Sequence, residues 1–110
     1  VQLIAAEGVW MRIKDDAGSI LYERIMDAQK PLDLPVSKNK KFIDRAGNSG
    51  ALFFVVNGKL YGPAGEKTRT VKNIELSARN IKSNYSLYTP GLESSLYSFL
   101  NDIESDALSD

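Results

Sequence analysis

The chain of 110 residues contains neither cysteine nor histidine. Without cysteine it has no disulfide and no thiolate chemistry, and this absence indicates no particular redox compartment, since cysteine-free chains suit either side of a membrane. Without histidine it lacks the commonest general base, the commonest metal ligand and the usual partner of a nucleophilic serine. We therefore expect no catalytic residue, no metal site and no cofactor.

An excess of charge of one sign is also missing, because 14 lysines and arginines balance 14 aspartates and glutamates. A formal net charge of zero provides no bulk attraction to polyanions, so we expect no nucleic-acid partner. The charges are unevenly placed, however: basic residues dominate from Lys30 to Lys72, and every charged residue after Leu92 is acidic. Two interpretations stay open, a solvated surface with an acidic tail and a tail that docks on a basic face.

Long hydrophobic segments are lacking as well. No stretch approaches the length of a transmembrane helix, and no signal peptide precedes Val1. The chain starts directly with the strand-like residues 1–6. We therefore expect a piece of a longer protein, from which any targeting or membrane segment has been left out.

The most apolar stretch of the chain runs from Ala51 to Val56 and is preceded by a turn at Gly47 and Asn48. Its β-branched and aromatic residues favour a strand. Apolar residues occupy both faces of this strand, so we expect both to be covered, one by the core and one by a helix, a partner chain or a second sheet. Asn57-Gly58 follows and predicts a type I′ hairpin, because both central positions of that turn need a positive φ.

Other segments show shorter strand patterns separated by turn residues such as Gly18. Residues 9–14 alternate clearly, with Val9, Met11 and Ile13 on one face. Residues 68–76 lack a clean period of two, which predicts a bulge near Asn73. The pattern as a whole predicts an all-β fold, a small antiparallel β-sandwich of about seven short strands, at residues 2–6, 9–14, 20–26, 30–35 (an edge strand or extended connection), 42–46, 51–56, 59–61 and 68–76.

Two local features have both a structural and a functional interpretation. Trp10 is expected to be half-buried over a neighbouring strand, and the alternative is a platform for a ligand. The adjacent carboxylates Asp15 and Asp16 lie in a turn; a calcium loop is disfavoured because the alternating oxygen ligands and distal glutamate are missing.

Helical patterns appear only near the C-terminus. Ser77 is expected to cap a short helical turn over residues 78–82. Thr89-Pro90 then predicts the start of an amphipathic helix. We therefore divide the chain into a β-sandwich domain, residues 1–84, and an acidic helical tail, residues 85–110, whose apolar side is a candidate interaction face and a candidate homodimer contact: Leu92, Leu96, Phe99, Leu100 and Ile103.

An ordered set of these motifs resembles the C-terminal domain of RodZ-like bacterial cell-shape proteins. It comprises Glu7-Gly8-Val9-Trp10, the turn containing Gly18 with the strand after it, Gly47-Asn48, the apolar strand with Phe54, Val56-Asn57-Gly58-Lys59, and Gly62-Pro63-x-Gly65. The resemblance implies a periplasmic β-domain of a bitopic inner-membrane protein. It also implies a cytoplasmic part that binds the actin-like protein MreB, and a role in rod shape through wall synthesis. The family offers no catalytic residues to carry over.

Three functional hypotheses follow. The first is a non-catalytic periplasmic interaction or scaffold domain that contacts membrane or cell-wall-synthesis proteins, with MreB reached only through the cytoplasmic part. The second is a carbohydrate- or peptidoglycan-binding module, which needs two or three aromatic residues on one concave face, chosen from Trp10, Tyr22, Tyr61, Tyr85, Tyr88 and Tyr97. The third, an enzyme using paired carboxylates such as Asp15 and Asp16, is disfavoured, because neighbouring carboxylates in a turn are usually solvated.

Overall fold

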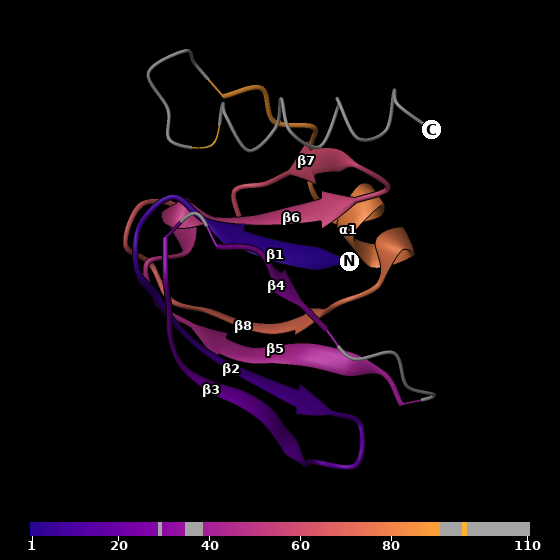
Figure 1. Cartoon of the computed structure of the whole chain (residues 1–110). Coiled ribbons are helices and arrows are strands. Elements are labelled where there is room, and N and C mark those ends of the chain that lie inside the picture. The colour runs from indigo at the N-terminus through magenta and orange to yellow at the C-terminus, as the bar shows by residue number, and fades with distance from the viewer. Residues whose placement is uncertain (29, 35–38, 91–95, 97–110) are drawn as a thin grey trace.

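The computed structural model describes residues 1–28, 30–34, 39–90 and 96. In this part of the chain, eight strands form two four-stranded antiparallel sheets, stacked face to face (Figure 1). One sheet, here called sheet A, has the order β4-β1-β6-β7, and the other, sheet B, has the order β3-β2-β5-β8. The predicted all-β sandwich is therefore confirmed.

The strands agree closely with the sequence pattern. Their bounds are β1 Gln2–Ala5, β2 Val9–Asp15, β3 Ile20–Met26, β4 Leu32–Asp33, β5 Lys41–Ala46, β6 Leu52–Val56, β7 Lys59–Tyr61 and β8 Val71–Glu75. The segment predicted as an edge strand or a connection forms β4, which raises the count from about seven to eight. The last strand is shorter than the predicted range 68–76.

Two local predictions about these strands are wrong. There is no bulge near Asn73, because β5 and β8 keep one continuous register; Asn73 instead adopts a left-handed conformation with φ 55°. Ala51 was assigned to the apolar strand, but it ends a 3-10 turn, η1 (Ser49–Ala51), and packs in the core between the sheets. The register shifts of sheet B lie elsewhere, next to Ile13 in β2.

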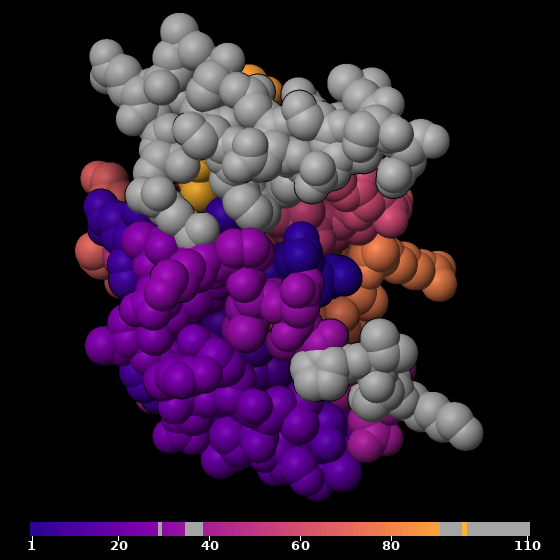
Figure 2. Space-filling view, viewed as in Figure 1, coloured from indigo at the N-terminus to yellow at the C-terminus, as the bar shows by residue number. Residues whose placement is uncertain are grey.

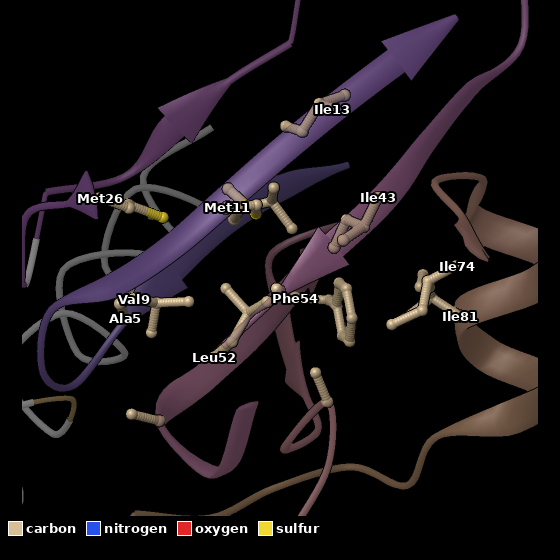
Figure 3. Packing of buried hydrophobic residues seen from close by; sticks show 14 of the residues in the cluster. Ala5, Val9, Met11, Ile13, Met26, Ile43, Leu52, Phe54, Ile74 and Ile81 are labelled. Carbon is tan, nitrogen blue, oxygen red and sulfur yellow. The ribbon is translucent and has the colours of Figure 1, made fainter. Parts of the chain in front are cut away.

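The central strand β6 lies between β1 and β7, and all five of its residues are buried. Leu52, Phe54 and Val56 point into the main core, where they meet the inward residues of sheet B, such as Met11. Figure 3 shows Phe54 among these residues, on the side of Ile74 and Ile81. Phe53 and Val55 point to the other side and belong to a second buried cluster. The prediction that both faces are covered is thus confirmed.

Turn chemistry fixes the connections. Asn57 and Gly58 adopt φ values of 52° and 74°, as the predicted hairpin between β6 and β7 requires. Gly50 donates its N–H to the carbonyl of Lys67 at 2.7 Å, and a Cβ at Gly50 would lie only 2.6–2.8 Å from the Lys67 backbone. Only glycine allows these two backbone segments to approach so closely without a shift of the backbone.

One short helix, α1 (Ala78–Asn84), follows the last strand and lies at one side of the sandwich (Figure 1). Ser77 is its N-cap, as predicted, and accepts a hydrogen bond from the Asn80 N–H at 3.1 Å. The helix extends past the predicted end at Lys82 to Asn84. Tyr85 then packs its ring against Phe54 with 4.8 Å between centroids, which closes this side of the core.

Candidate interaction surface

A row of charged residues crosses the outer face of sheet B. Cross-strand register places Glu23 of β3 opposite Arg12 of β2, Arg12 opposite Arg45 of β5, and Arg45 opposite Lys72 of β8. Their neighbours along the strands, such as Met11, are fully buried in the core, so the charged side chains point to the outside. Three cations therefore stand side by side on adjacent strands, an arrangement that costs stability through like-charge repulsion.

Asp44 relieves only part of this repulsion. It accepts a hydrogen bond from Arg12 Nε at 2.7 Å, and Lys14 Nζ lies 3.7 Å from the same carboxylate oxygen. The hydrogen bond from Arg12 is the main reason why the pKa of Asp44 lies below its usual value of 3.8. Arg45 and Lys72 are exposed and form no ion pair within the described residues. The row thus carries uncompensated positive charge.

A shallow hollow lies at the centre of this row. It has a volume of about 230 Å³ and is lined by Arg12, Asp44, Arg45, Lys72 and Asn73. Asn73, one of these lining residues, has a left-handed backbone conformation.

Apolar side chains adjoin the charged row at the β3 end of sheet B. Ile25 lies directly opposite Trp10 and keeps 63% of its surface exposed; Trp10 keeps 36%. Ile20 and Leu21 of the same strand are 54% and 41% exposed. The Arg12 guanidinium lies 5.7 Å from the centre of the Trp10 ring, close enough for a cation–π contact. Trp10 is exposed, so the expectation that it is half-buried over a neighbouring strand is not met, and it joins the cations to an exposed apolar area.

The outer face of sheet B thus combines exposed apolar groups with unpaired cations, and we take it as the candidate interaction surface. In the space-filling view, the β2–β3 hairpin forms the lower part of the molecule (Figure 2). Exposed large apolar residues are normal when scattered, but a group of them on one strand beside charged residues is typical of a binding surface.

Apart from Trp10, the residues singled out from the family motif lie elsewhere and act on the shape of the fold. Gly18 adopts φ 85° in the β2–β3 turn, and Gly62 adopts φ 133° before Pro63 at the end of β7. Asn48 Nδ2 donates to the Gly8 carbonyl at 3.1 Å and so ties the β1–β2 connection to the start of η1. Gly47 has open space where a Cβ would lie. Most of the motif therefore describes the scaffold, and Trp10 is its residue on the candidate interaction surface.

Of the residues in the predicted interaction face of the tail, the structure describes Leu96. Leu96 is 1% exposed and belongs to the second buried cluster, on the outer face of sheet A, together with Ile4, Phe53, Val55 and Leu60. Tyr88 packs against Phe53 at the edge of this cluster, with ring centroids 4.6 Å apart. Leu92, Phe99, Leu100 and Ile103 lie outside the described residues, and the division at residue 84 stays a prediction.

The aromatic residues that the structure describes do not form the platform that a glycan-binding module needs. Tyr22, Tyr61 and Tyr85 pack against the main core, and Tyr88 lies on the sheet A side. Among the tryptophan and tyrosine residues described, Trp10 is alone on the outer face of sheet B; Tyr97 lies outside the described residues. Phe42, which is paired with Lys14, is the other aromatic side chain on this face among the described residues.

Asp15, the first carboxylate of the acidic turn, has a structural role. Asp15 Oδ1 accepts hydrogen bonds from the N–H groups of Ala17 and Ser19, at 3.0 and 2.9 Å, so it stabilises the turn before β3. In the part of the chain that the structure describes, no group of three acidic residues is arranged to hold a metal ion. A search of the same residues for a helix long and apolar enough to span a bilayer finds none.

Sequence reasoning missed the charged row and the exposed side of β3. The residues of β3 mix polar and apolar types on both faces, so the sequence did not show which face of β3 is buried. That mixture was itself the signal, since a strand with one buried face alternates. The alignment of Arg12, Arg45 and Lys72 had no local signal, because they lie on three separate strands.

Together, the fold and the surface define a small all-β sandwich domain with one mixed apolar and cationic face. A family model supplies the particular relationship: residues 2–75 match the RodZ C-terminal domain. The chain belongs to this family, which confirms the resemblance seen in the motifs. Comparison with curated proteins and with solved structures finds no significant match.

Proposed function

We propose that this chain is a non-catalytic interaction domain on the periplasmic side of the inner membrane, in a bitopic protein that links the MreB cytoskeleton to cell-wall synthesis. Membership in the RodZ C-terminal domain family suggests a role in a RodZ-like cell-shape protein. The family is not known as enzymatic. MreB is reached through a cytoplasmic part, and this domain contacts membrane or wall-synthesis proteins.

The outer face of sheet B is the observation that carries this proposal. It carries Trp10 and Ile25, both exposed, on the same face as Arg45 and Lys72, which have no acidic partner among the described residues. Such a surface costs stability in the free domain through repulsion between like charges. A partner that supplies apolar contact and negative charge would remove this cost.

Deletion of the domain from the protein in its native bacterium tests the proposal. We expect rod-shaped cells to become round while the membrane-anchored remainder is still produced. A phosphatase that is active only in the periplasm, fused after residue 110, tests the placement and should be active. Normal rods after deletion would contradict the proposed function, and an inactive fusion would contradict the location.

A glycan-binding module is the second candidate, because Trp10 is exposed on a sheet face with Arg12 above its ring. The absence of further tryptophan or tyrosine side chains on that face, within the described residues, argues against it. Co-sedimentation of the purified chain with isolated peptidoglycan separates the two candidates. Binding that is lost in Trp10→Ala would favour the glycan module over the protein-interaction domain.

A further inference from the structure

The four edge strands of the two sheets differ in how they are protected from pairing with another chain. β4 has only two residues and follows Pro31. The outer edge of β7 is hydrogen-bonded to a later segment of the same chain, where the Tyr88 N–H donates to the Leu60 carbonyl at 2.9 Å. β8 is distorted by the left-handed Asn73. Short length, proline, covering segments and local distortion are the usual means of blocking an edge.

β3 is protected less than the other three edges: its irregularity is a register shift at Leu21, and from Tyr22 to Met26 its pairing with β2 is regular. It runs for seven residues, contains neither proline nor lysine, and pairs with β2 alone among the described strands. It also carries Ile20, Leu21 and Ile25, three of the large apolar residues that are exposed in the described part of the chain. A long, apolar, unblocked edge is a template for an additional strand.

Hydrogen bonding within sheet B shows which backbone groups of β3 are free. The Gly47 N–H donates to the Trp10 carbonyl at 2.9 Å, so the peptide groups of Trp10 face β5. Because these directions alternate along an antiparallel strand, Met11 faces β3, where it pairs with Arg24. Arg24 is thus bonded to β2, and Glu23 and Ile25 direct their N–H and C=O groups to the free edge.

The side chains at this edge indicate what the additional strand must carry. Ile25 needs an apolar neighbour, since it is 63% exposed and lies beside Trp10. Glu23 lies opposite Arg12, but Arg12 donates to Asp44 instead, so the Glu23 carboxylate has no ion pair within the described residues. A basic side chain on the added strand would fit beside Glu23.

A second copy of this chain fits the edge poorly. If two β3 strands paired antiparallel over their full length, residues 20–26, the two-fold axis would place Glu23 directly opposite its own equivalent. Like charges in direct cross-strand pairs are destabilising. The register that uses the whole strand thus disfavours a second copy, and we assign the edge to a different chain.

We propose that β3 is a docking edge that takes an extended segment of another protein as a fifth strand of sheet B, with an apolar residue beside Ile25 and a basic residue beside Glu23. The proposal rests on the proposed function, and it specifies the kind of partner. Main-chain hydrogen bonds from Glu23 and Ile25 supply affinity, and the two side-chain positions supply specificity.

Substitutions at the edge test this proposal in the full protein in its native bacterium. Ile25→Lys places a blocking charge at the edge, and Glu23→Pro removes a donor that points to the edge and not to β2. Leu87→Lys is the matched control, because Leu87 is 61% exposed but lies on the sheet A side. We expect both edge variants to lose rod shape, as deletion of the domain does, and Leu87→Lys to keep it.

Each other outcome is informative. Rods in both edge variants, together with round cells after deletion of the domain, would overturn the docking edge and leave the proposed function intact. Rods after deletion would refute the proposed function itself. Round cells in Leu87→Lys would show a general effect of added charge and overturn the edge proposal. Thermal melting of the purified variants identifies one that fails to fold, and the other edge variant then decides.

Light scattering on the purified chain tests the alternative occupant. We expect the mass to be the same for the wild-type chain and for Ile25→Lys. A wild-type dimer that becomes a monomer in Ile25→Lys would show that a second copy occupies the edge, and would overturn the assignment to a different protein.

Discussion

Replacing Phe54 by alanine tests the account of the core most directly. Phe54 is fully buried at the middle of β6, one of the two interior strands of sheet A, and its ring contacts Tyr85. Truncation removes most of an aromatic ring from a closed space between two sheets. The surrounding strands cannot collapse into it without breaking their ladders, so a cavity remains. The expected cost is therefore about 3–5 kcal/mol of the free energy of unfolding.

This loss is large relative to the stability of a small domain, roughly 5–15 kcal/mol. At an unfolding entropy of about 2.1 cal/mol/K per residue, it corresponds to a fall in the melting temperature of roughly 13–22 °C for a chain of this length. Urea unfolding followed by tryptophan fluorescence gives the free energy, and calorimetry gives the melting temperature. The single tryptophan, Trp10, lies outside the core and reports on sheet B.

Phe54→Leu is the matched control, since leucine keeps much of the apolar volume, and its cost should stay below about 1.5 kcal/mol. A loss below about 1 kcal/mol for Phe54→Ala would refute the reasoning, because surface substitutions usually fall in that range. An equal loss in Phe54→Leu and Phe54→Ala would show that the lost ring contact with Tyr85, not the cavity, dominates the cost.

The remaining predictions concern the tail, a tight turn and the charged row. Deleting residues 89–110 removes Leu96 from its buried position, so it should lower stability by at least ~1.5–3 kcal/mol or change the oligomeric state; an unchanged melting temperature and mass would contradict this. Gly50→Ala should cost ~1–3 kcal/mol in urea unfolding, whereas Gly47→Ala, with open space around it, should cost much less. Arg12→Gln should raise the pKa of Asp44 in an NMR titration. Because the pKa of Asp44 in the folded chain lies below 3.8, its contribution to stability is present above pH 3.8 and is lost as the pH falls through the folded-state pKa. An unchanged Asp44 pKa in Arg12→Gln would refute the role of the hydrogen bond.

Local signals in the sequence determined the strands, the turns and the family. Val9, Met11 and Ile13 alternate with polar residues because one face of β2 meets the core, and such alternation is readable without knowing the partner strand. Asn57 and Gly58 specify their turn through their own φ preferences. Both kinds of signal reside within a few neighbouring residues.

Only the tertiary structure decided which strands share a sheet, and hence where the surface lies. Pairings between strands far apart in the sequence bring Arg12, Arg45 and Lys72 together. β3 is a free edge because sheet B continues on the other side of β2, through β5. Pairing of this kind depends on the packing of all strands at once, and no short stretch of sequence encodes it. The scaffold was therefore predictable from the sequence, while the candidate interaction surface and its docking edge emerged from the packing of the two sheets.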